Sequence, residues 1–185
     1  MSEDALVERV RVRAAEDGEE LGAGVGSAEV AGVEAVVGFT LPPLLLRLYR
    51  EVGNGGFGPD GAMLPLSGEE PSVVSVYRGE RARSDEAAGV EEDGPHWPTG
   101  VLPVLDWGCG MYAAVDCLRP GAPVLLFEPN AVGDDWADAW FEDAPSLAQW
   151  LDGWLDGAGW WEEEAMADES RVMEPWPDAA ARIAG

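Results

Sequence analysis

A leucine-rich run that ends in a glycine turn constrains the fold more than any other part of the sequence. In LPPLLLRLYREVGNGGFGP, apolar residues recur every three or four positions across residues 41–52, which predicts a helix with one buried stripe. Thr40 precedes this helix as a candidate N-cap, and Pro42 and Pro43 fall in its first turn, where missing N–H groups cost little. The NGG that follows tolerates positive φ, so we expect the chain to reverse there. Phe57 then packs under the turn and AMLPL begins a strand.

Further helices surround a group of short predicted strands. Apolar spacing predicts helices at residues 3–15 and 145–156, and a short helix that follows Ser27 and ends at Val37. SVVSVYRGERARSD also fits a helix despite its β-branched residues, because its polar positions recur on one side. VLPVLDWG, MYAAVDCL and PVLLFEP are apolar runs separated by short turns, which is typical of an antiparallel meander. EAAGVEEDGPHWP and NAVGDDWADAWFEDA are acidic and are predicted to be loops.

The charge of the chain restricts its partners. The sequence has 36 acidic residues against 11 basic ones, all of them arginine, and a net charge of −25. Such a field repels nucleic acids and anionic membranes and speeds association with basic proteins. The alternative interpretation is that the acids only keep the protein soluble. The N-terminal MSEDALVERV lacks the positive charge and apolar stretch of a secretion signal, which predicts a cytoplasmic protein.

Few residues are candidates for chemistry. His96 is the only histidine, and Cys109 and Cys117 are the only cysteines. We expect both thiols to be reduced, because an extended strand between them would hold them too far apart for a disulfide. A Cys–His hydrolase would need one thiol to meet His96 in space, whereas a small buried cysteine is common in protein cores. GNGGFG does not match GxGxxG and lacks a phosphate-binding lysine, so it does not predict a phosphate-binding loop. The acids near Asp60 and Asp134 lack EF-hand spacing, and we predict no catalytic, cofactor or metal site.

Tryptophans and acids near the ends of the predicted strands form a candidate interface. Exposed aromatic side chains surrounded by charge are typical anchors of protein interfaces. We therefore predict that a protein partner binds an acidic rim made of Asp106, Trp107, Asp116, Glu128, Asp134, Asp135 and Trp136. The alternative is that the tryptophans are only partly buried, and that Asp106 and Asp116 pair with the backbone of their own turns.

The order of these features resembles a known family. LPPLLLRLYREVGNGGFGP resembles the LP…(Y/F)…NGG signature of the SMI1/KNR4 family of the SUKH superfamily. PVLDWGCGMYAAVDC, VLLFEPN and WFEDAPSLAQWLDGWLDG resemble the rest of the domain, in the same order. The positions that match the structural motif are Leu41, Pro42, Tyr49, Asn54, Gly55, Gly56 and Gly110. The resemblance covers residues 27–157 and leaves out an N-terminal helix with an acidic, glycine-rich linker (1–26) and an acidic, tryptophan-containing extension (158–185). Trp160, Trp161 and Trp176 predict that the extension packs on the domain, and a disordered tail is the alternative.

The resemblance carries expectations about fold and function. It implies an α+β fold with a central, mainly antiparallel sheet covered by helices. Bacterial members of the family are typically immunity proteins that bind toxin domains, often nucleases, and fungal relatives are regulatory interaction proteins. No catalytic residues are established across the family. We therefore expect a bacterial, non-enzymatic binding protein whose partner is a basic toxin domain. A regulatory or scaffold protein without a toxin partner is the alternative.

Overall fold

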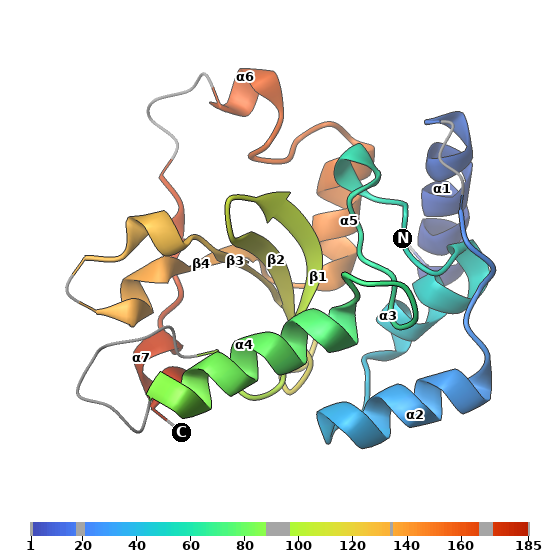
Figure 1. Ribbon diagram of the computed structural model, residues 1–185. Helices are drawn as coiled ribbons and strands as arrows, with labels where there is room; N and C mark the ends of the chain where they lie inside the picture. The colour runs from blue at the N-terminus through green and yellow to red at the C-terminus, as the bar shows by residue number, and fades with distance from the viewer. Residues whose placement is uncertain (1, 18–20, 88–96, 134, 167–171, 185) are drawn as a thin grey trace.

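The structure is an α+β fold around one open antiparallel sheet, as the sequence predicts (Figure 1). The computed structural model describes residues 2–17, 21–87, 97–133, 135–166 and 172–184. The helices and short helical turns are α1 (Glu3–Glu16), α2 (Ser27–Val37), α3 (Pro43–Arg47), η1 (Leu48–Val52), η2 (Pro59–Gly61), α4 (Val73–Ala87), η3 (Pro129–Ala131), η4 (Trp136–Ala139), α5 (Leu147–Leu155), α6 (Glu163–Met166) and α7 (Ala179–Ile183). The strands are β1 (Val101–Gly108), β2 (Met111–Asp116), β3 (Val124–Phe127), β4 (Trp140–Ala144) and β5 (Glu174–Pro175).

The sheet is a meander in which each strand pairs with the next one along the chain, in the order β1-β2-β3-β4-β5. Its first three strands confirm the predicted meander. The fourth strand corrects a prediction, because β4 lies within NAVGDDWADAWFEDA, which the sequence suggested was a loop. Phe127 of β3 lies opposite Trp140 of β4, and both side chains are buried. Strand pairing and this aromatic contact therefore outweigh the acidic composition of the segment.

Helices cover both faces of the sheet. Figure 1 shows α4 and α5 on different sides of it, with α1, α2 and α3 gathered at one side of the molecule. The helix α4 confirms the helical interpretation of SVVSVYRGERARSD. The predicted stripe of α5 is also confirmed, since Leu147, Trp150, Leu151 and Trp154 are buried. No helix within the described residues is both long and apolar enough to cross a membrane.

The N-terminal helix belongs to the same core. Leu6, Val7 and Val10 of α1 are buried in one hydrophobic cluster with the sheet and the other helices. At the edge of this contact, the Arg9 guanidinium donates to Asp152 of α5 at 2.8 Å. The segment outside the family resemblance therefore packs on the domain that follows it.

The leucine-rich helix differs in detail from its prediction. It begins at Pro43 with Pro42 as its N-cap, so Thr40 does not cap it. Its second half, η1, is a π-helical turn that ends before Gly53. In α2 the N-cap is Gly26, so Ser27, after which this helix was predicted to start, is already its first helical residue. In α3, Pro43 fits the first helical position because a backbone N–H there would have no partner within the helix.

The predicted strand at AMLPL is reduced to a single bridge between Met63 and Leu105. Leu64 donates its backbone N–H to Val104 at 2.9 Å, but the pairing does not continue. Pro65 has no N–H, and the N–H of Leu66 is already bonded to the side chain of Asn54 at 2.7 Å. The predicted strand is wrong because neither Pro65 nor Leu66 has a free backbone N–H that could continue the pairing with β1.

The residues of the NGG turn have defined structural roles. Asn54 accepts from Leu66 and donates to the carbonyl of Ser67 at 3.1 Å, so its side chain ties the turn to the next segment. Gly55 has φ +84°, and a Cβ built there would lie 2.6 Å from the backbone nitrogen of Pro65. Tyr49 is buried, and its hydroxyl donates to the Leu64 carbonyl at 2.9 Å.

Other motif positions also serve packing and turns. Gly56 donates to the carbonyl of Met63 at 2.9 Å. Leu41 is buried, and its N–H donates to Glu34 of α2 at 2.9 Å. Phe57 is fully buried with its ring against Tyr49, as the sequence predicts. The motif residues therefore hold the end of η1 against the segment that follows the NGG turn.

The C-terminal extension packs on the domain. The strand β5 adds to the edge of β4, and Trp176 is buried with its ring 5.8 Å from that of Trp140. Nearer the start of the extension, the indole N–H of Trp160 donates to Asp143 at 3.3 Å. The rings of Trp161 and Trp150 lie 5.4 Å apart. These contacts confirm the expectation that the tryptophans anchor the extension.

Candidate partner-binding surface

The turn between β1 and β2 and the chain between β3 and β4 lie at the same end of the sheet. The register places Tyr112 of β2 opposite both Asp106 of β1 and Phe127 of β3. The turn itself runs through Gly108, Cys109 and Gly110, with φ values of +82°, +53° and +82°. This strained backbone makes a tight hairpin, which agrees with the structural role predicted for Gly110. We refer to this end, with η3 and η4, as the hairpin end.

Three of the predicted acids lie at the hairpin end and accept hydrogen bonds from their own turns. Asp106 accepts from the N–H of Gly108 at 2.7 Å. Glu128 accepts from the N–H of Asn130 at 2.8 Å, and Asp135 accepts from that of Ala137, also at 2.8 Å. The turn-pairing alternative therefore holds for Asp106, and it holds for Asp116 too, which accepts from the N–H of Leu118 at 3.1 Å. These bonds leave each side chain able to accept further donors, because a carboxylate accepts up to about four hydrogen bonds.

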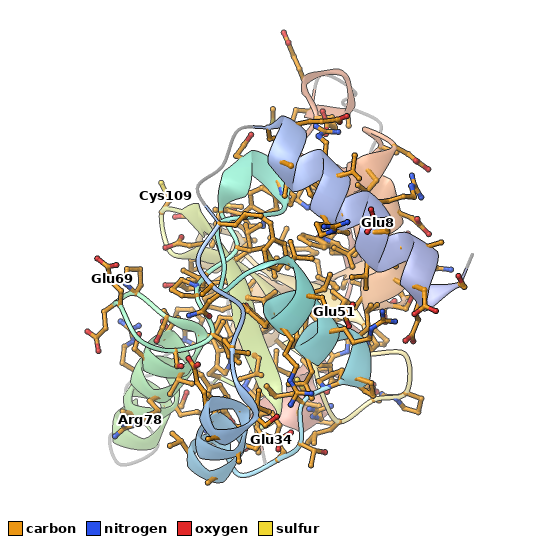
Figure 2. All side chains as sticks on the ribbon, turned by 90° about the vertical axis from the view of Figure 1, so that its right-hand side faces the viewer. Glu8, Glu34, Glu51, Glu69, Arg78 and Cys109 are labelled. Carbon is orange, nitrogen blue, oxygen red and sulfur yellow. The ribbon has the colours of Figure 1, made fainter. Side chains whose placement is uncertain are left out.

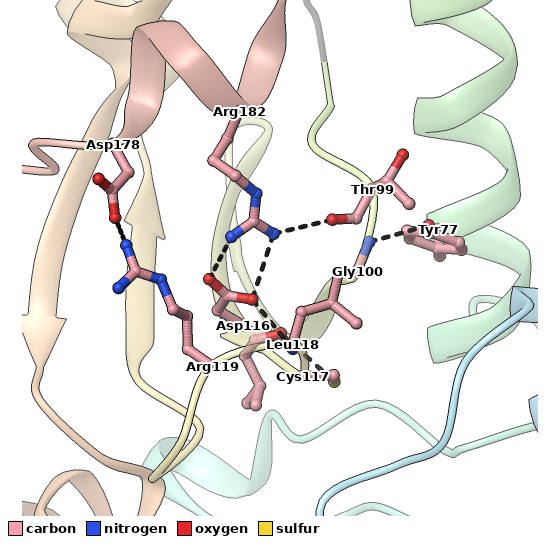
Figure 3. Close-up of polar contacts among 10 residues, drawn as sticks. Tyr77, Thr99, Gly100, Asp116, Cys117, Leu118, Arg119, Asp178 and Arg182 are labelled. Atoms are coloured by element: carbon pink, nitrogen blue, oxygen red, sulfur yellow. Dashed lines mark hydrogen bonds and ion pairs between the residues drawn. The ribbon is translucent and has the colours of Figure 1, made fainter. Parts of the chain in front are cut away.

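Asp116 lies at the opposite end of β2 and points into the protein. Its carboxylate is 1% exposed and accepts from the Arg182 guanidinium at 2.7 Å and from the N–H of Leu118 at 3.1 Å (Figure 3). Arg182 also donates to the carbonyl of Thr99 at 2.9 Å. The structure thus separates Asp116 from the other predicted residues and places it in an internal ion pair.

The two predicted tryptophans have different surroundings. The ring of Trp107 lies 5.1 Å from that of Trp160 and 5.0 Å from that of Trp161, so the C-terminal extension covers it. Trp136 is half-buried in η4 and lines a surface pocket with Tyr112 and Phe127. Trp136 is therefore the predicted tryptophan that borders a cavity. Asp134 lies outside the described residues.

The helix side of this pocket was not predicted from the sequence. Glu80 and Arg83 of α4 line it, and they form an ion pair one helical turn apart. Glu80 is 5% exposed, and burial raises its pKa although the neighbouring Arg83 acts to lower it. Burial also raises the pKa of Tyr112, with smaller contributions from the Asp106 and Glu80 carboxylates. The i, i+3 spacing of Glu80 and Arg83 was visible in the sequence, but nothing there indicated that Glu80 is buried.

The candidates for thiol or metal chemistry are not assembled into a site within the described residues. Cys109 and Cys117 flank β2 at its opposite ends and are not bonded to each other. Burial raises the pKa of Cys117, which is the opposite of what an activated thiolate requires. His96 lies outside the described residues. Across the part of the chain that is described, no three His, Cys, Asp or Glu side chains gather closely enough to hold a metal ion.

Ion pairs with carboxylates of the same chain neutralise much of the positive charge. Within the described residues, an ion pair with a carboxylate is made by Arg9, Arg11, Arg13, Arg47, Arg83, Arg119 and Arg182. The chain has only 11 basic residues for 36 acids, so most carboxylates have no arginine available to them. Figure 2 shows acidic side chains such as Glu8, Glu51 and Glu69 around one side of the molecule. The excess negative charge is therefore carried by the surface.

Comparison with known proteins supports the resemblance. No curated protein matches the chain significantly. The sequence profile of the SMI1/KNR4 family (SUKH-1) matches residues 24–153, which include the leucine-rich helix, the NGG turn, β1 to β4 and most of α5. The chain therefore belongs to the SMI1/KNR4 family.

Proposed function

We propose that this protein is a non-enzymatic, cytoplasmic immunity protein that binds and neutralises a basic toxin domain. Membership of the SMI1/KNR4 family supports a binding role, because bacterial SUKH domains are typically immunity proteins. The observation that carries the choice of partner is the net charge of −25 on a chain whose arginines are mostly paired internally.

A nuclease toxin suits this charge. An enzyme that cleaves nucleic acid needs a positive surface to hold phosphates. An acidic protein is steered toward such a surface and competes there with the substrate, as long as salt does not screen the attraction. The immunity protein then needs no chemistry of its own, because covering the cleft is sufficient.

The hairpin end is the proposed contact surface. Asp106, Glu128 and Asp135 supply charge there, and Trp136 supplies an aromatic anchor beside a pocket. Asp134 remains in the proposal as part of the same segment. We give Trp107 a supporting role behind this surface, because its ring packs on Trp160 and Trp161 of the C-terminal extension. We leave Asp116 out because its carboxylate is buried against Arg182.

Capture of partners from the native cells tests the proposal. The protein is immobilised, and bound proteins are identified after washes at low and at high salt. We expect one stoichiometric basic partner that salt releases, that arrests growth when expressed alone, and that becomes harmless when the two are co-expressed. Several unrelated partners without toxicity would contradict the proposal and favour a regulatory scaffold instead.

Charge-neutral variants test the position of the surface. Replacing Asp106→Asn, Glu128→Gln and Asp135→Asn together removes three charges but keeps an acceptor for each turn. The matched control replaces Glu8→Gln, Glu16→Gln and Glu51→Gln, which are exposed on α1 and η1. We expect only the hairpin-end variant to lose affinity, by about 10-fold or more. An equal loss in both variants would show that net charge alone matters.

A further inference from the structure

A pocket of ≈ 220 Å³ at the hairpin end combines a buried carboxylate with aromatic walls. Tyr112 and Phe127 line it from the sheet, Trp136 lines it from η4, and Glu80 and Arg83 line it from α4. Aromatic rings next to a carboxylate are the chemistry that recognises an organic cation, because the ring faces and the carboxylate both attract positive charge.

Glu80 is the group that gives the pocket its preference. It is 5% exposed, so its negative charge is poorly solvated and gains from a cationic partner. One carboxylate oxygen, Oε1, accepts from the Arg83 guanidinium. Within the described residues, Arg83 is the side chain that the structure shows bonded to this carboxylate. A carboxylate with one oxygen engaged has room for a second donor.

Arg83 shows which kind of cation fits. Its side chain is 59% exposed, whereas that of Glu80 is 7% exposed, so the arginine approaches the carboxylate from the solvent side. Because the Arg83 guanidinium is itself solvated, it returns to water at little cost when another donor replaces it at Glu80. Arg83 therefore marks a position from which a guanidinium reaches Glu80 on the solvent side.

A second concavity extends the pocket along α4. It measures ≈ 480 Å³ and shares Arg83 and Tyr112 with the first pocket, so the two adjoin. Its other lining residues include Glu70, Ser75 and Gly79. A partner segment with one side chain near Glu80 would therefore run along α4 toward the second carboxylate, Glu70.

We propose that this pocket receives an arginine side chain of the basic partner, whose guanidinium binds Glu80 between Tyr112, Phe127 and Trp136 and displaces Arg83. The inference rests on the proposed function and adds the residue chemistry of the contact. Arginine fits better than lysine because its planar guanidinium pairs with a carboxylate through two donors and stacks on aromatic rings.

The test uses a small cationic probe and needs no knowledge of the partner. Acetyl-Gly-Arg-Gly-amide is titrated into the full chain, and the indole N–H signal of Trp136 is followed by NMR. The matched probe carries citrulline, which has the shape of arginine but no charge. We expect the arginine peptide to shift the Trp136 signal with saturation and the citrulline peptide to leave it unchanged.

Three variants separate the pocket from the general negative field. Glu80→Gln keeps the shape and removes the charge, and we expect it to weaken binding of the arginine peptide by about 10-fold or more. Arg83→Met removes the internal competitor and keeps the methylenes. We expect it to strengthen binding of the arginine peptide several-fold, because the probe no longer competes with the Arg83 guanidinium for the carboxylate. Glu8→Gln changes the net charge by the same amount as Glu80→Gln, and we expect no effect.

Two outcomes would overturn the proposal: equal affinity in wild type and Glu80→Gln, or weaker binding in Arg83→Met whose thermal unfolding matches that of the wild type. These outcomes are distinct from failure of the proposed function. If the native partner is captured and its binding depends on Asp106, Glu128 and Asp135 while the peptide results are negative, the immunity role stands and only the arginine pocket is refuted.

Discussion

Gly55 shows how a single residue fixes the turn that joins the leucine-rich helix to the sheet. Its φ of +84° lies in the left-handed region, and a Cβ there would lie 2.6 Å from the backbone nitrogen of Pro65. Two independent penalties therefore act on any larger residue, because the backbone is strained and the added carbon meets backbone atoms that cannot rotate away.

We predict that Gly55→Ala lowers the free energy of unfolding by about 2–4 kcal/mol. Gly32→Ala is the matched control, because Gly32 lies in the interior of α2 and a Cβ there meets nothing within 4 Å. It should raise stability by about 0.5–1 kcal/mol through better helix propensity. Urea unfolding of both variants measures the difference. A Gly55→Ala variant as stable as the wild type would refute the role of the turn.

Glu80 gives a second prediction at the residue scale, for the pH dependence of stability. Its pKa is raised in the folded state, mainly by burial. A raised carboxyl pKa favours folding below the pKa of the unfolded chain, and this contribution is lost as pH rises through the folded value. Glu80→Gln does not titrate. We predict that its stability relative to wild type improves as pH rises above about 4.5, the ordinary pKa of a glutamate carboxyl.

Chemical denaturation of both proteins across this pH range measures the change. Other titrating groups are the same in the two proteins and cancel in the difference. Glu8→Gln is the control, because Arg11 lowers the pKa of the exposed Glu8 carboxyl. For that variant the relative stability should move the opposite way or stay constant. A relative stability of Glu80→Gln that falls with rising pH would contradict the assignment.

At the scale of elements, α7 is tied to β2 by an ion pair. Asp116 is 1% exposed, and Arg182 spans from α7 to this carboxylate and to the Thr99 carbonyl (Figure 3). Trp176 adds a ring stacked near Arg182 and Trp140. The C-terminal extension is thus part of the folded core, although it lies beyond the family match that ends at residue 153.

We predict that Arg182→Met destabilises the protein by about 3 kcal/mol, because it leaves a buried charge at Asp116 without a partner. Adding Asp116→Asn should recover most of the loss, since the neutral amide still accepts from the N–H of Leu118. Thermal unfolding of the single and double variants forms the test. Equal losses in the two would mean that packing of α7, and not the ion pair, is the stabilising contact.

At the scale of the whole molecule, negative charge dominates. A net charge of −25 repels itself in the compact state more than in the expanded chain. The arginine–carboxylate pairs are mostly exposed, and each contributes little to stability. Added salt therefore removes little attraction from these pairs, and it removes more of the repulsion among the excess carboxylates.

We predict that the melting temperature rises with NaCl from about 0.01 M and levels off near about 0.3 M, where the screening length becomes short. Calorimetry at constant pH measures it. KCl should give the same curve, because screening depends on ionic strength and not on the identity of the cation. A melting temperature that falls with salt would show that attractive pairs outweigh the repulsion.

Much of the fold was predictable because its signals are local. The stripes of α1, α3 and α5 are periodic in the sequence and are buried in the structure. The turn between the first two strands carries the glycines that its positive φ angles require. A helix or a hairpin is specified by residues within a few positions of each other, so the sequence alone suffices.

The site was predictable only in part. Composition identified the hairpin-end acids Asp106, Glu128 and Asp135 and the aromatic Trp136. It also grouped them with Asp116, which lies at the far end of β2 in an internal ion pair. Glu80 was not predicted, because nothing in the sequence of α4 indicates that this one acid is buried.

The sequence by itself determined the helices, the meander, the NGG turn and the negative charge, because each depends on neighbouring residues or on simple sums. Only the tertiary structure decided that Trp140 begins a strand, that the segment at Met63 makes a single bridge, and that Asp116 is buried while Glu80 faces a pocket. Those outcomes depend on which distant segment supplies a hydrogen bond, an opposite charge or an apolar surface. Such partners are set by the fold and not by the local pattern.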